Sequence, residues 1–312
     1  MGKYRYLLRR VVFAVVVLYI VVTLMFVLFT LTPETKLKAM LFPYRMANAD
    51  PEKIRQIKES YYAARRLDEP LLSRYLGWLV DVTLFRWGYS LTLDRPVTEL
   101  VAAGTLRSLA YIVPATVFSV TGGIGIGFLA AWRQGSLGER VARIGVYLLF
   151  GVPSFFLGGL LLLSIATGEA AGSTLQQWIL PVVVLTLSLL AGQVSFARSE
   201  AMEYVNAPFV TFLRAKGFGG RAIMRRVLRN AAIPILSLVF SELLLVLLLN
   251  VFVIEFLFHI QGLGRLTYVA ANERDLPLVF GTTVVIVAVA VLGSLLQDAV
   301  VSSLDPRVDA FD

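Results

Sequence analysis

Long apolar stretches with few or no charged residues recur along this chain and restrict its possible folds more than any other feature. The first of them, residues 11–31, contains no Asp, Glu, Lys or Arg. Each stretch is close to the roughly 20 residues that an α-helix needs to cross the hydrocarbon core of a bilayer. With 57% hydrophobic and 16% charged residues among 312, the chain is too apolar for a soluble domain. We therefore predict an all-α polytopic membrane protein with six transmembrane helices, over residues 11–31, 109–132, 145–166, 178–197, 233–258 and 278–301. Pro153 is expected to kink the third of them.

The distribution of positive charge predicts how these helices are oriented. Lys and Arg gather in residues 1–10 and 198–232, whereas the short segment 167–177 contains none and 259–277 contains two. Short segments rich in Lys and Arg stay on the cytoplasmic side of a membrane. We expect the uncleaved N-terminus, the 198–232 loop and the tail to be cytoplasmic, and the long region after the first helix to form a small extracytoplasmic cap. The corresponding ranges are 1–10, 198–232 and 302–312 inside, and 32–108 and 259–277 outside.

Composition excludes several classes of function. A formal net charge of +8 would suit nucleic acid, but the basic residues lie in segments between apolar stretches instead of in one patch with aromatics. The chain has no cysteine and one histidine, His259, so neither a thiolate site nor a histidine cluster for a metal is expected. The G-x-x-x-x-G-K-[ST] sequence is absent, so the usual phosphate-binding loop is absent too. We predict no catalytic residues and no metal site in this chain.

Four glycines in residues 122–127 invite comparison with a dinucleotide-binding loop. They lie inside an apolar stretch, however, and no strand precedes them. Gly123 and Gly127 are four residues apart, which is the spacing that lets two membrane helices approach closely. We therefore predict a helix–helix contact at these two positions.

Residues 198–232 form a charged segment between two apolar stretches. Asn206 suits a helix cap, Pro208 suits the first turn, and Gly217 suits a left-handed stop after a basic last turn. A helix of about two to three turns is expected between them. A second short helix is expected to begin after Gly220 and to end at Pro234.

The side chains of this segment are expected to form one apolar face and one basic stripe. Phe209, Phe212 and Leu213 fall at i, i+3 and i+4 of the first helix, and so share a face. The basic stripe lies on the second helix and consists of Arg221, Arg225 and Arg229. Two short helices fixed by glycines would form a rigid projection that a soluble partner could move. The positive charge of this segment, taken alone, is equally consistent with a cytoplasmic loop that is attracted to anionic lipid headgroups and binds no protein partner.

Polar residues inside the apolar stretches are candidates for a transport pathway. Glu242 and Asn250 are eight residues apart, about 80° of helical rotation, which places them on the same half of their helix. An ionisable group at bilayer depth is costly and is expected to face the bundle interior or a water-filled path. Hydrogen bonding between two helices is an equally open alternative for both. Glu255 lies near the outer end of the same helix, where we expect water or headgroups to solvate it, and Asp298 lies near the end of the last helix.

Several short motifs occur in the order and spacing of one known family. The 198–232 segment contains Arg-Ala-Lys-Gly at 214–217, and Leu-Arg-Asn-Ala at 228–231 with Pro234 after it. The 32–108 region contains Leu-Asp-Glu-Pro-Leu at 67–71, and the chain ends with Leu-Asp-Pro-Arg-Val at 304–308. Together they resemble the permease subunits of dipeptide, oligopeptide and nickel ABC importers, the inner-membrane components of binding-protein-dependent transport.

This resemblance implies a type I ABC importer permease fold in the plasma membrane and a set of partners. The partners would be a second related permease, favouring a heterodimer, two cytoplasmic ATPases that bind ATP and Mg, and an extracytoplasmic solute-binding protein. The resemblance leaves the solute open among peptides, oligosaccharides and nickel chelates. The residues expected to couple to the ATPases are Phe209, Phe212, Leu213, Arg214, Ala215, Lys216, Gly217, Arg221 and Arg225. Glu242, Asn250 and Glu255 are the residues expected to line the pathway.

The sequence departs from the family at two places, and one other function stays open. Thr211 stands where the general coupling motif has a glutamate, and the fifth apolar stretch is rich in leucine where the family tends to have glycine. The alternative is a proton-coupled secondary transporter that uses Glu242 or Asp298. The six predicted helices show no evident inverted repeat, which disfavours that alternative.

Overall fold

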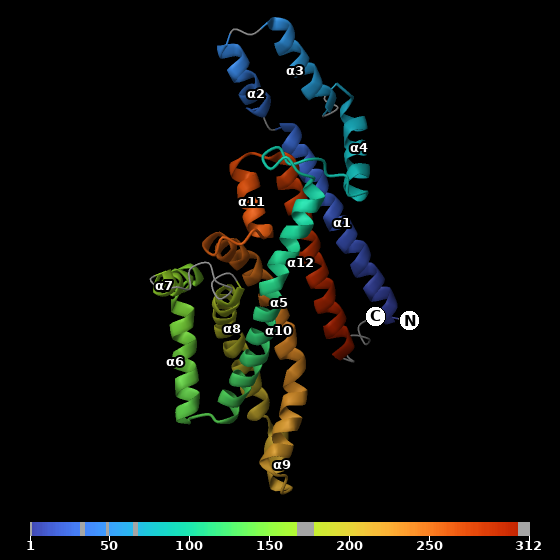
Figure 1. Ribbon diagram of the computed structural model, residues 1–312. Helices are drawn as coiled ribbons and strands as arrows, with labels where there is room; N and C mark the ends of the chain where they lie inside the picture. Colours follow the sequence, from blue (N-terminus) through green and yellow to red (C-terminus); the bar gives the residue numbers. More distant parts are fainter. Residues whose placement is uncertain (1, 32–34, 48–49, 65–67, 167–177, 305–312) are drawn as a thin grey trace. The chain divides into compact units, whose positions relative to one another are not determined.

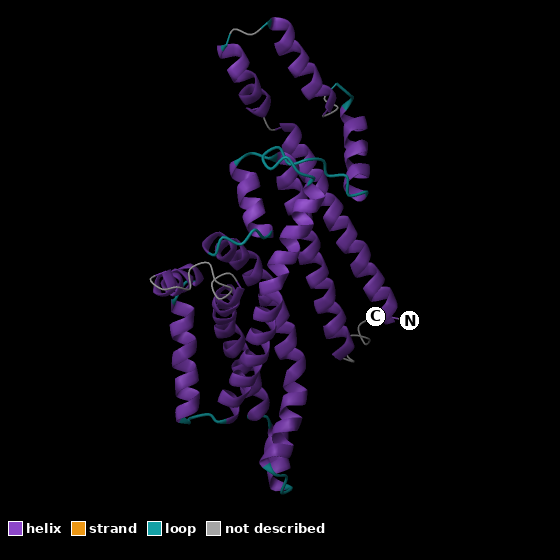
Figure 2. Ribbon diagram, in the orientation of Figure 1, coloured by secondary structure: helices purple, strands orange, loops and turns teal. Residues whose placement is uncertain are grey.

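The computed structural model describes residues 2–31, 35–47, 50–64, 68–166 and 178–304, and these are mostly helical (Figure 2). Side chains are described except at 2–7, 35–36, 38–40, 64, 164–166, 232–234, 236–248 and 300–304. The described part contains no strand, and its one isolated extended pairing joins Tyr89 to Pro96. In chain order the helices are α1 (Gly2–Leu31), α2 (Thr35–Met46), α3 (Pro51–Ala64), α4 (Leu71–Thr83), α5 (Val97–Trp132), α6 (Leu137–Gly151), α7 (Ser154–Ala166), α8 (Leu180–Val205), α9 (Pro208–Ala215), α10 (Gly220–Leu257), α11 (Leu263–Asn272) and α12 (Leu276–Leu304) (Figure 1).

The chain divides into two compact units, which are described separately. The first unit consists of Met1–Val12, Ala103–Leu266 and Val289–Asp312. The second consists of Phe13–Ala102 and Thr267–Ala288. The first therefore holds α6 to α10 with most of α5, and the second holds α2, α3 and α4 with most of α1.

Four helices in the described part are long and apolar enough to cross a membrane. They are Leu8–Leu31, Val97–Trp132, Leu180–Val205 and Leu276–Ala299. The 38 residues of α10 include the fifth predicted stretch, 233–258, up to Leu257, but most side chains of that stretch lie outside the described set. A chain with several such helices is a multi-pass membrane protein. The number of six transmembrane helices stays a prediction.

The first unit is built around α8, which packs against α6 on one side and α10 on another. Helix α5 joins this packing at two glycines. A Cβ atom on Gly127 would lie 2.6 Å from the carbonyl oxygen of Val194 and 2.7 Å from the Cβ of Ala197. A Cβ atom on Gly123 would overlap Gln193. The predicted close contact at Gly123 and Gly127 is therefore confirmed, and its partner is α8.

The region predicted as one kinked helix over 145–166 consists of two helices in the structure. Helix α6 ends at Gly151 and α7 begins at Ser154, with a bend of 90° between them. Pro153 precedes the first residue of α7, where its missing N–H costs no helical hydrogen bond. The first helix also begins earlier than predicted because Ser136 caps it, accepting a hydrogen bond from the backbone N–H of Glu139 at 3.2 Å. The kink predicted at Pro153 is thus a 90° bend between two helices, and the predicted start at residue 145 was wrong because the helix begins at Leu137.

Helix α3 in the second unit begins at a local start signal, Asp50 followed by Pro51. The backbone N–H of Glu52 donates to the side chain of Asp50 at 3.0 Å, and Pro51 is the first helical residue. Its apolar side chains pack against α2 in a small core of Leu37, Leu41 and Tyr61, joined by Ile54 and Ile57.

An aromatic core joins α1, α4 and α12 within the second unit. Trp78 lies at its centre, with its ring centroid 4.3 Å from that of Phe280 and 5.8 Å from that of Phe29. The indole of Trp87 packs into the same core.

Candidate functional site

Helix α9 lies at the turn between α8 and α10 and is the predicted helix of the 198–232 segment (Figure 1). Pro208 occupies its first turn, as predicted. The prediction that Asn206 caps it was wrong, because Asn206 ends α8 and Ala207 occupies the cap position without a side-chain hydrogen bond. The α8 helix runs on to Val205, eight residues past the apolar stretch, and so takes up the polar residues that were expected to form a loop.

The end of α9 agrees with the sequence prediction. Lys216 is its C-cap residue, and Gly217 has a φ of 77°. The N–H of Gly217 donates to the carbonyl of Arg214 at 3.0 Å, and the N–H of Phe218 donates to the carbonyl of Leu213 at 3.1 Å. These bonds satisfy carbonyl groups that would otherwise end the helix unpaired. The left-handed residue therefore fixes the direction in which the chain leaves α9.

The predicted apolar face of α9 is divided between the protein core and the surface. Leu213 is buried, and Val210, which the sequence analysis did not single out, is 1% exposed. Both belong to a core formed with residues of α5, α8 and α10. Phe209 packs partly against that core, whereas Phe212 is 57% exposed. The face therefore anchors α9 to its own chain and leaves one aromatic ring for an external contact.

The basic side chains around α9 are exposed. Arg214 and Lys216 lie at the end of α9, and Ala215 and Gly217 between and after them are exposed as well. The ammonium group of Lys216 lies 4.4 Å from the ring centroid of Phe212, a cation–π contact. The predicted stripe on α10 is confirmed as an exposed set consisting of Arg221, Arg225 and Arg229. Its helix is not short, however, because α10 continues without a break through position 234.

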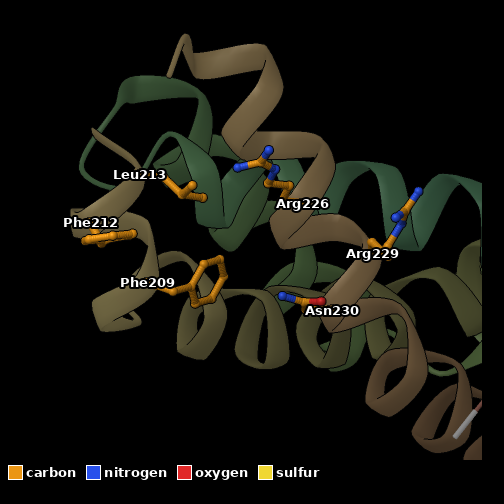
Figure 3. A pocket seen from close by; sticks show the side chains of 6 residues that line it. All are labelled: Phe209, Phe212, Leu213, Arg226, Arg229 and Asn230. Carbon is orange, nitrogen blue, oxygen red and sulfur yellow. The ribbon is translucent and has the colours of Figure 1, made fainter. Parts of the chain in front are cut away.

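A hollow lies between α9 and the first turns of α10 (Figure 3). Its volume is about 330 Å³. We call it the α9–α10 hollow, and it is lined by Phe209, Phe212, Leu213, Arg226, Arg229 and Asn230. Three of these residues were predicted to couple to a partner, and the other three come from α10. Sequence analysis missed Arg226 because it does not share the four-residue spacing of the stripe.

The three candidate pathway residues of α10 have different surroundings. The side chain of Glu242 lies outside the described set, and Asn250 is half-buried. Glu255 is fully buried, so the prediction that water or headgroups solvate it was wrong. It lines no accessible surface of this chain.

Glu255 is the centre of a hydrogen-bonded cluster. One carboxylate oxygen accepts from the hydroxyl of Ser108 at 2.5 Å and from that of Tyr111 at 3.1 Å. The other accepts from the backbone N–H of Arg265 at 2.9 Å. A Cβ atom on Gly262 would overlap the carboxylate, so only glycine leaves room at that position. The cluster ties α10 to α5 and to the start of α11.

A second buried carboxylate joins α6 to α8. Glu139 is 4% exposed, and its oxygen lies 2.8 Å from a guanidinium nitrogen of Arg198 and 3.6 Å from one of Arg143. Sequence analysis read these arginines only as markers of the cytoplasmic side. The Ser-x-x-Glu pattern from Ser136 to Glu139 was a signal for the start of a helix and could have located the carboxylate.

A third buried carboxylate, Asp275, organises the second unit. It accepts a hydrogen bond from the hydroxyl of Ser90 at 2.6 Å and from the backbone N–H of Thr92 at 2.9 Å. It also accepts from the backbone N–H of Leu278 in the first turn of α12 at 3.3 Å. Asp275 therefore holds the loop that contains Ser90 against the start of α12.

Asp298, the other residue of the proton-transport alternative, forms an ion pair within the first unit. One of its carboxylate oxygens lies 3.1 Å from a guanidinium nitrogen of Arg10. The pair joins the end of α12 to the start of α1.

These features define the class of the protein. Several membrane-length helices, with a short basic helix fixed at the turn between α8 and α10, describe a multi-pass membrane protein. The family model described as "Binding-protein-dependent transport system inner membrane component" matches residues 123–310. The model for the N-terminal part of such membrane components matches residues 3–94. The chain belongs to this family of binding-protein-dependent inner-membrane transport components.

Individual relatives cover nearly the whole chain. The metal-staphylopine import system permease protein CntB of Staphylococcus aureus is 26% identical over 312 residues, with 98% of each chain covered. The dipeptide transport system permease protein DppB of Bacillus subtilis is 27% identical, with 97% of each chain covered. Among solved structures, the MetNI methionine ABC transporter in an inward-facing conformation matches with a TM-score of 0.56 at 18% identity, over 67% of this chain and 98% of that one. The chain is thus a membrane component of the peptide-type ABC importer family, as its motifs indicated.

Proposed function

We propose that this chain forms one half of the transmembrane pathway of an ATP-driven importer, and that helix α9 receives the movement of a cytoplasmic ATPase. The observation that carries the proposal is the way α9 is held. Its inner side is packed through Val210 and Leu213, its end is fixed at Gly217, and its outer side presents Phe212 and exposed cations. A helix held on one side and open on the other suits docking without rearrangement of its own chain.

The packing beneath α9 offers a route from the docking site to the transmembrane helices. Val210 and Leu213 share one core with Ala201 of α8, Val227 of α10 and Phe128 of α5. Protein interiors are close-packed, so a displaced side chain displaces its neighbours. A push on α9 would move these three helices together, turning the path between inward-open and outward-open states.

The proposed assembly has the partners that a binding-protein-dependent importer needs. Two cytoplasmic ATPases would bind and hydrolyse ATP with Mg, a second related permease would supply the other half of the path, and a binding protein would deliver the solute outside. The excess of Lys and Arg in residues 1–10 and 198–232 supports an orientation with both chain ends in the cytoplasm of a cell whose plasma membrane holds the protein.

The proposed solute is peptide-like, with an oligosaccharide as the other candidate. Relatives with full coverage are named for dipeptide and for metal-staphylopine transport. Asn250 on α10 is half-buried. We propose that Asn250 and Glu242 face the path.

The proposal is tested by purifying the chain from its native membrane and reconstituting what purifies with it. We expect two ATPases, a second permease and a binding protein by mass spectrometry, and solute uptake into proteoliposomes that stops without ATP. Recovery of the chain alone after mild crosslinking, with uptake that follows a proton gradient, would overturn the importer assignment.

A further inference from the structure

The α9–α10 hollow combines an apolar wall with hydrogen-bond donors. Phe209 and Leu213 of α9 contribute the wall, and Arg226 and Asn230 of α10 contribute nitrogen donors (Figure 3). The amide of Asn230 faces the ring of Phe209 across the gap. About 330 Å³ is enough for one or two side chains of a partner but not for a folded element.

The charge around the hollow selects an anionic occupant. Between Glu203 and Glu242 the sequence contains no Asp or Glu. The same interval contains six basic residues, Arg214, Lys216, Arg221, Arg225, Arg226 and Arg229. None of the six forms an ion pair with any residue that the structure describes. No carboxylate in the described part of the chain pairs with them, so their field attracts a negatively charged group.

Arg226 lines the hollow and is held in place by an aromatic ring. Its guanidinium carbon lies 4.2 Å from the ring centroid of Phe218, a cation–π contact. A guanidinium group carries its five N–H donors around its edge in a fixed fork. The edge can then bind a carboxylate with two parallel hydrogen bonds.

The depth of Arg226 favours a protein over a lipid as the occupant. Arg226 precedes Ile233, the start of the apolar stretch, by seven residues, which is about 10 Å along the helix. The polar layer on each side of a bilayer is roughly 5–7 Å deep. For a steeply crossing helix, the guanidinium group lies beyond the lipid headgroups.

We propose that an Asp or Glu side chain of the ATPase inserts into the α9–α10 hollow, with its carboxylate ion-paired to Arg226 and its aliphatic part against Phe209 and Leu213. This inference rests on the proposed function, which supplies the ATPase. It goes further in naming the chemistry of the contact and in adding α10 to the docking surface.

A zero-length crosslinking experiment tests the contact in the intact complex. Arg226→Lys places a primary amine in the hollow, in a Lys216→Arg background that removes the nearest other amine. A water-soluble carbodiimide joins an amine to a carboxylate only where the two are in contact. We expect a crosslinked peptide between position 226 and an Asp or Glu of the ATPase. The matched control is Leu228→Lys, which carries the same amine about 200° around the helix on an exposed side chain, and it should give at least tenfold less product.

Charge reversal gives a second measurement. Arg226→Glu should lower the amount of ATPase recovered with the chain by about tenfold. Arg140→Glu on α6 makes the same change at an exposed position away from the hollow and should lower it less than twofold. Both side chains are exposed, so neither change should affect folding of the chain.

The outcomes separate this contact from the proposed function. An intact complex that gives no product from position 226, equal product from both positions, or product with the carboxylate of phosphatidylserine would overturn the contact and leave the importer assignment standing. Absence of an ATPase from the wild-type preparation would instead overturn the proposed function.

Discussion

The hydroxyl of Ser108 and the carboxylate of Glu255 form a hydrogen bond of 2.5 Å between two residues that are 147 positions apart in the sequence. The same Ser108 oxygen accepts a hydrogen bond from the backbone N–H of Leu263 at 2.8 Å. Ser108 therefore donates to α10 and accepts from the first residue of α11. The junction of three helices depends on one hydroxyl and one carboxylate.

Replacing the Glu255 carboxylate by an amide should destabilise this junction. In Glu255→Gln one of the two oxygens becomes an NH₂ group, which cannot accept from Arg265 on one side or from Ser108 and Tyr111 on the other. A buried donor left without an acceptor costs about 1–3 kcal/mol. We expect the Tm of the detergent-solubilised protein to fall by several degrees.

Glu203→Gln makes the same chemical change on an exposed side chain of α8 and is the control. Its Tm should stay within about one degree of wild type, since exposed substitutions rarely change stability by more than about 0.5 kcal/mol. Equal Tm values for both variants would show that the buried cluster contributes nothing to stability.

Replacing either of two glycines of α5 by alanine should change the stability of the protein, in opposite directions at the two positions. A Cβ atom on Gly127 would lie 2.9 Å from the backbone nitrogen of Arg198 and closer still to Val194, so Gly127→Ala must push α5 and α8 apart. Overpacking of this kind costs about 1–3 kcal/mol. Gly125 has open space at the Cβ position, and Gly125→Ala should gain about 0.5–1 kcal/mol of helix stability. Thermal unfolding of the two variants checks the prediction, and a Gly127→Ala protein as stable as wild type would contradict the close contact.

The ion pair between Glu139 and Arg198 should show a measurable coupling energy. Glu139 is buried and Arg198 is only 25% exposed, so water screens the pair less than it screens a surface pair. We expect Glu139→Gln and Arg198→Gln to be non-additive by about 1–2 kcal/mol in a double-mutant cycle on unfolding free energy. The corresponding cycle with Arg143→Gln should give less, because Arg143 is 46% exposed and 3.6 Å away. A cycle that closes to zero for Arg198 would show that α6 is held to α8 by apolar packing alone.

Features that depend on neighbouring residues could be predicted from the sequence. The first turn of α9 at Pro208, its stop at Gly217 and the start of α3 at Pro51 follow from local backbone preferences, which do not require knowledge of the fold. The close approach at Gly123 and Gly127 follows similarly from the need for small residues where membrane helices touch. The family followed from motifs spread over most of the chain.

Features that depend on distant residues could not be predicted in the same way. Asp275 reaches Ser90 across 185 residues, and no local pattern at either position indicates the partner. The buried state of Glu255 is of the same kind, since position near a helix end suggested exposure. The kink at Pro153 was expected, but its size of 90° could not be predicted, because a proline in an apolar stretch either kinks a helix or ends it and the choice depends on tertiary packing.

Gly217 gives the sharpest test of α9 as a docking helix, because a matched glycine lies two residues away. Its φ of 77° is in the left-handed region, and a Cβ atom there would meet nothing within 4 Å. Gly217→Val therefore introduces backbone strain of about 1–3 kcal/mol without a steric clash. The strain is relieved by loss of the bonds that end α9, so the helix should fray at Arg214 and Lys216.

The same substitution at Gly219 distinguishes the effect of backbone strain from the effect of a larger side chain. The backbone of Gly219 has φ −66° and ψ 152°, an extended conformation that valine favours, and its Cβ position is open as well. We expect Gly217→Val to lower the amount of solute imported per ATP hydrolysed by at least fivefold in proteoliposomes. Gly217→Asn should lower this ratio less, because asparagine tolerates a positive φ. Gly219→Val should give the wild-type ratio. Equal ratios for Gly217→Val and Gly219→Val would mean that the fixed end of α9 has no part in coupling, and the docking role would then have to be sought elsewhere on the chain.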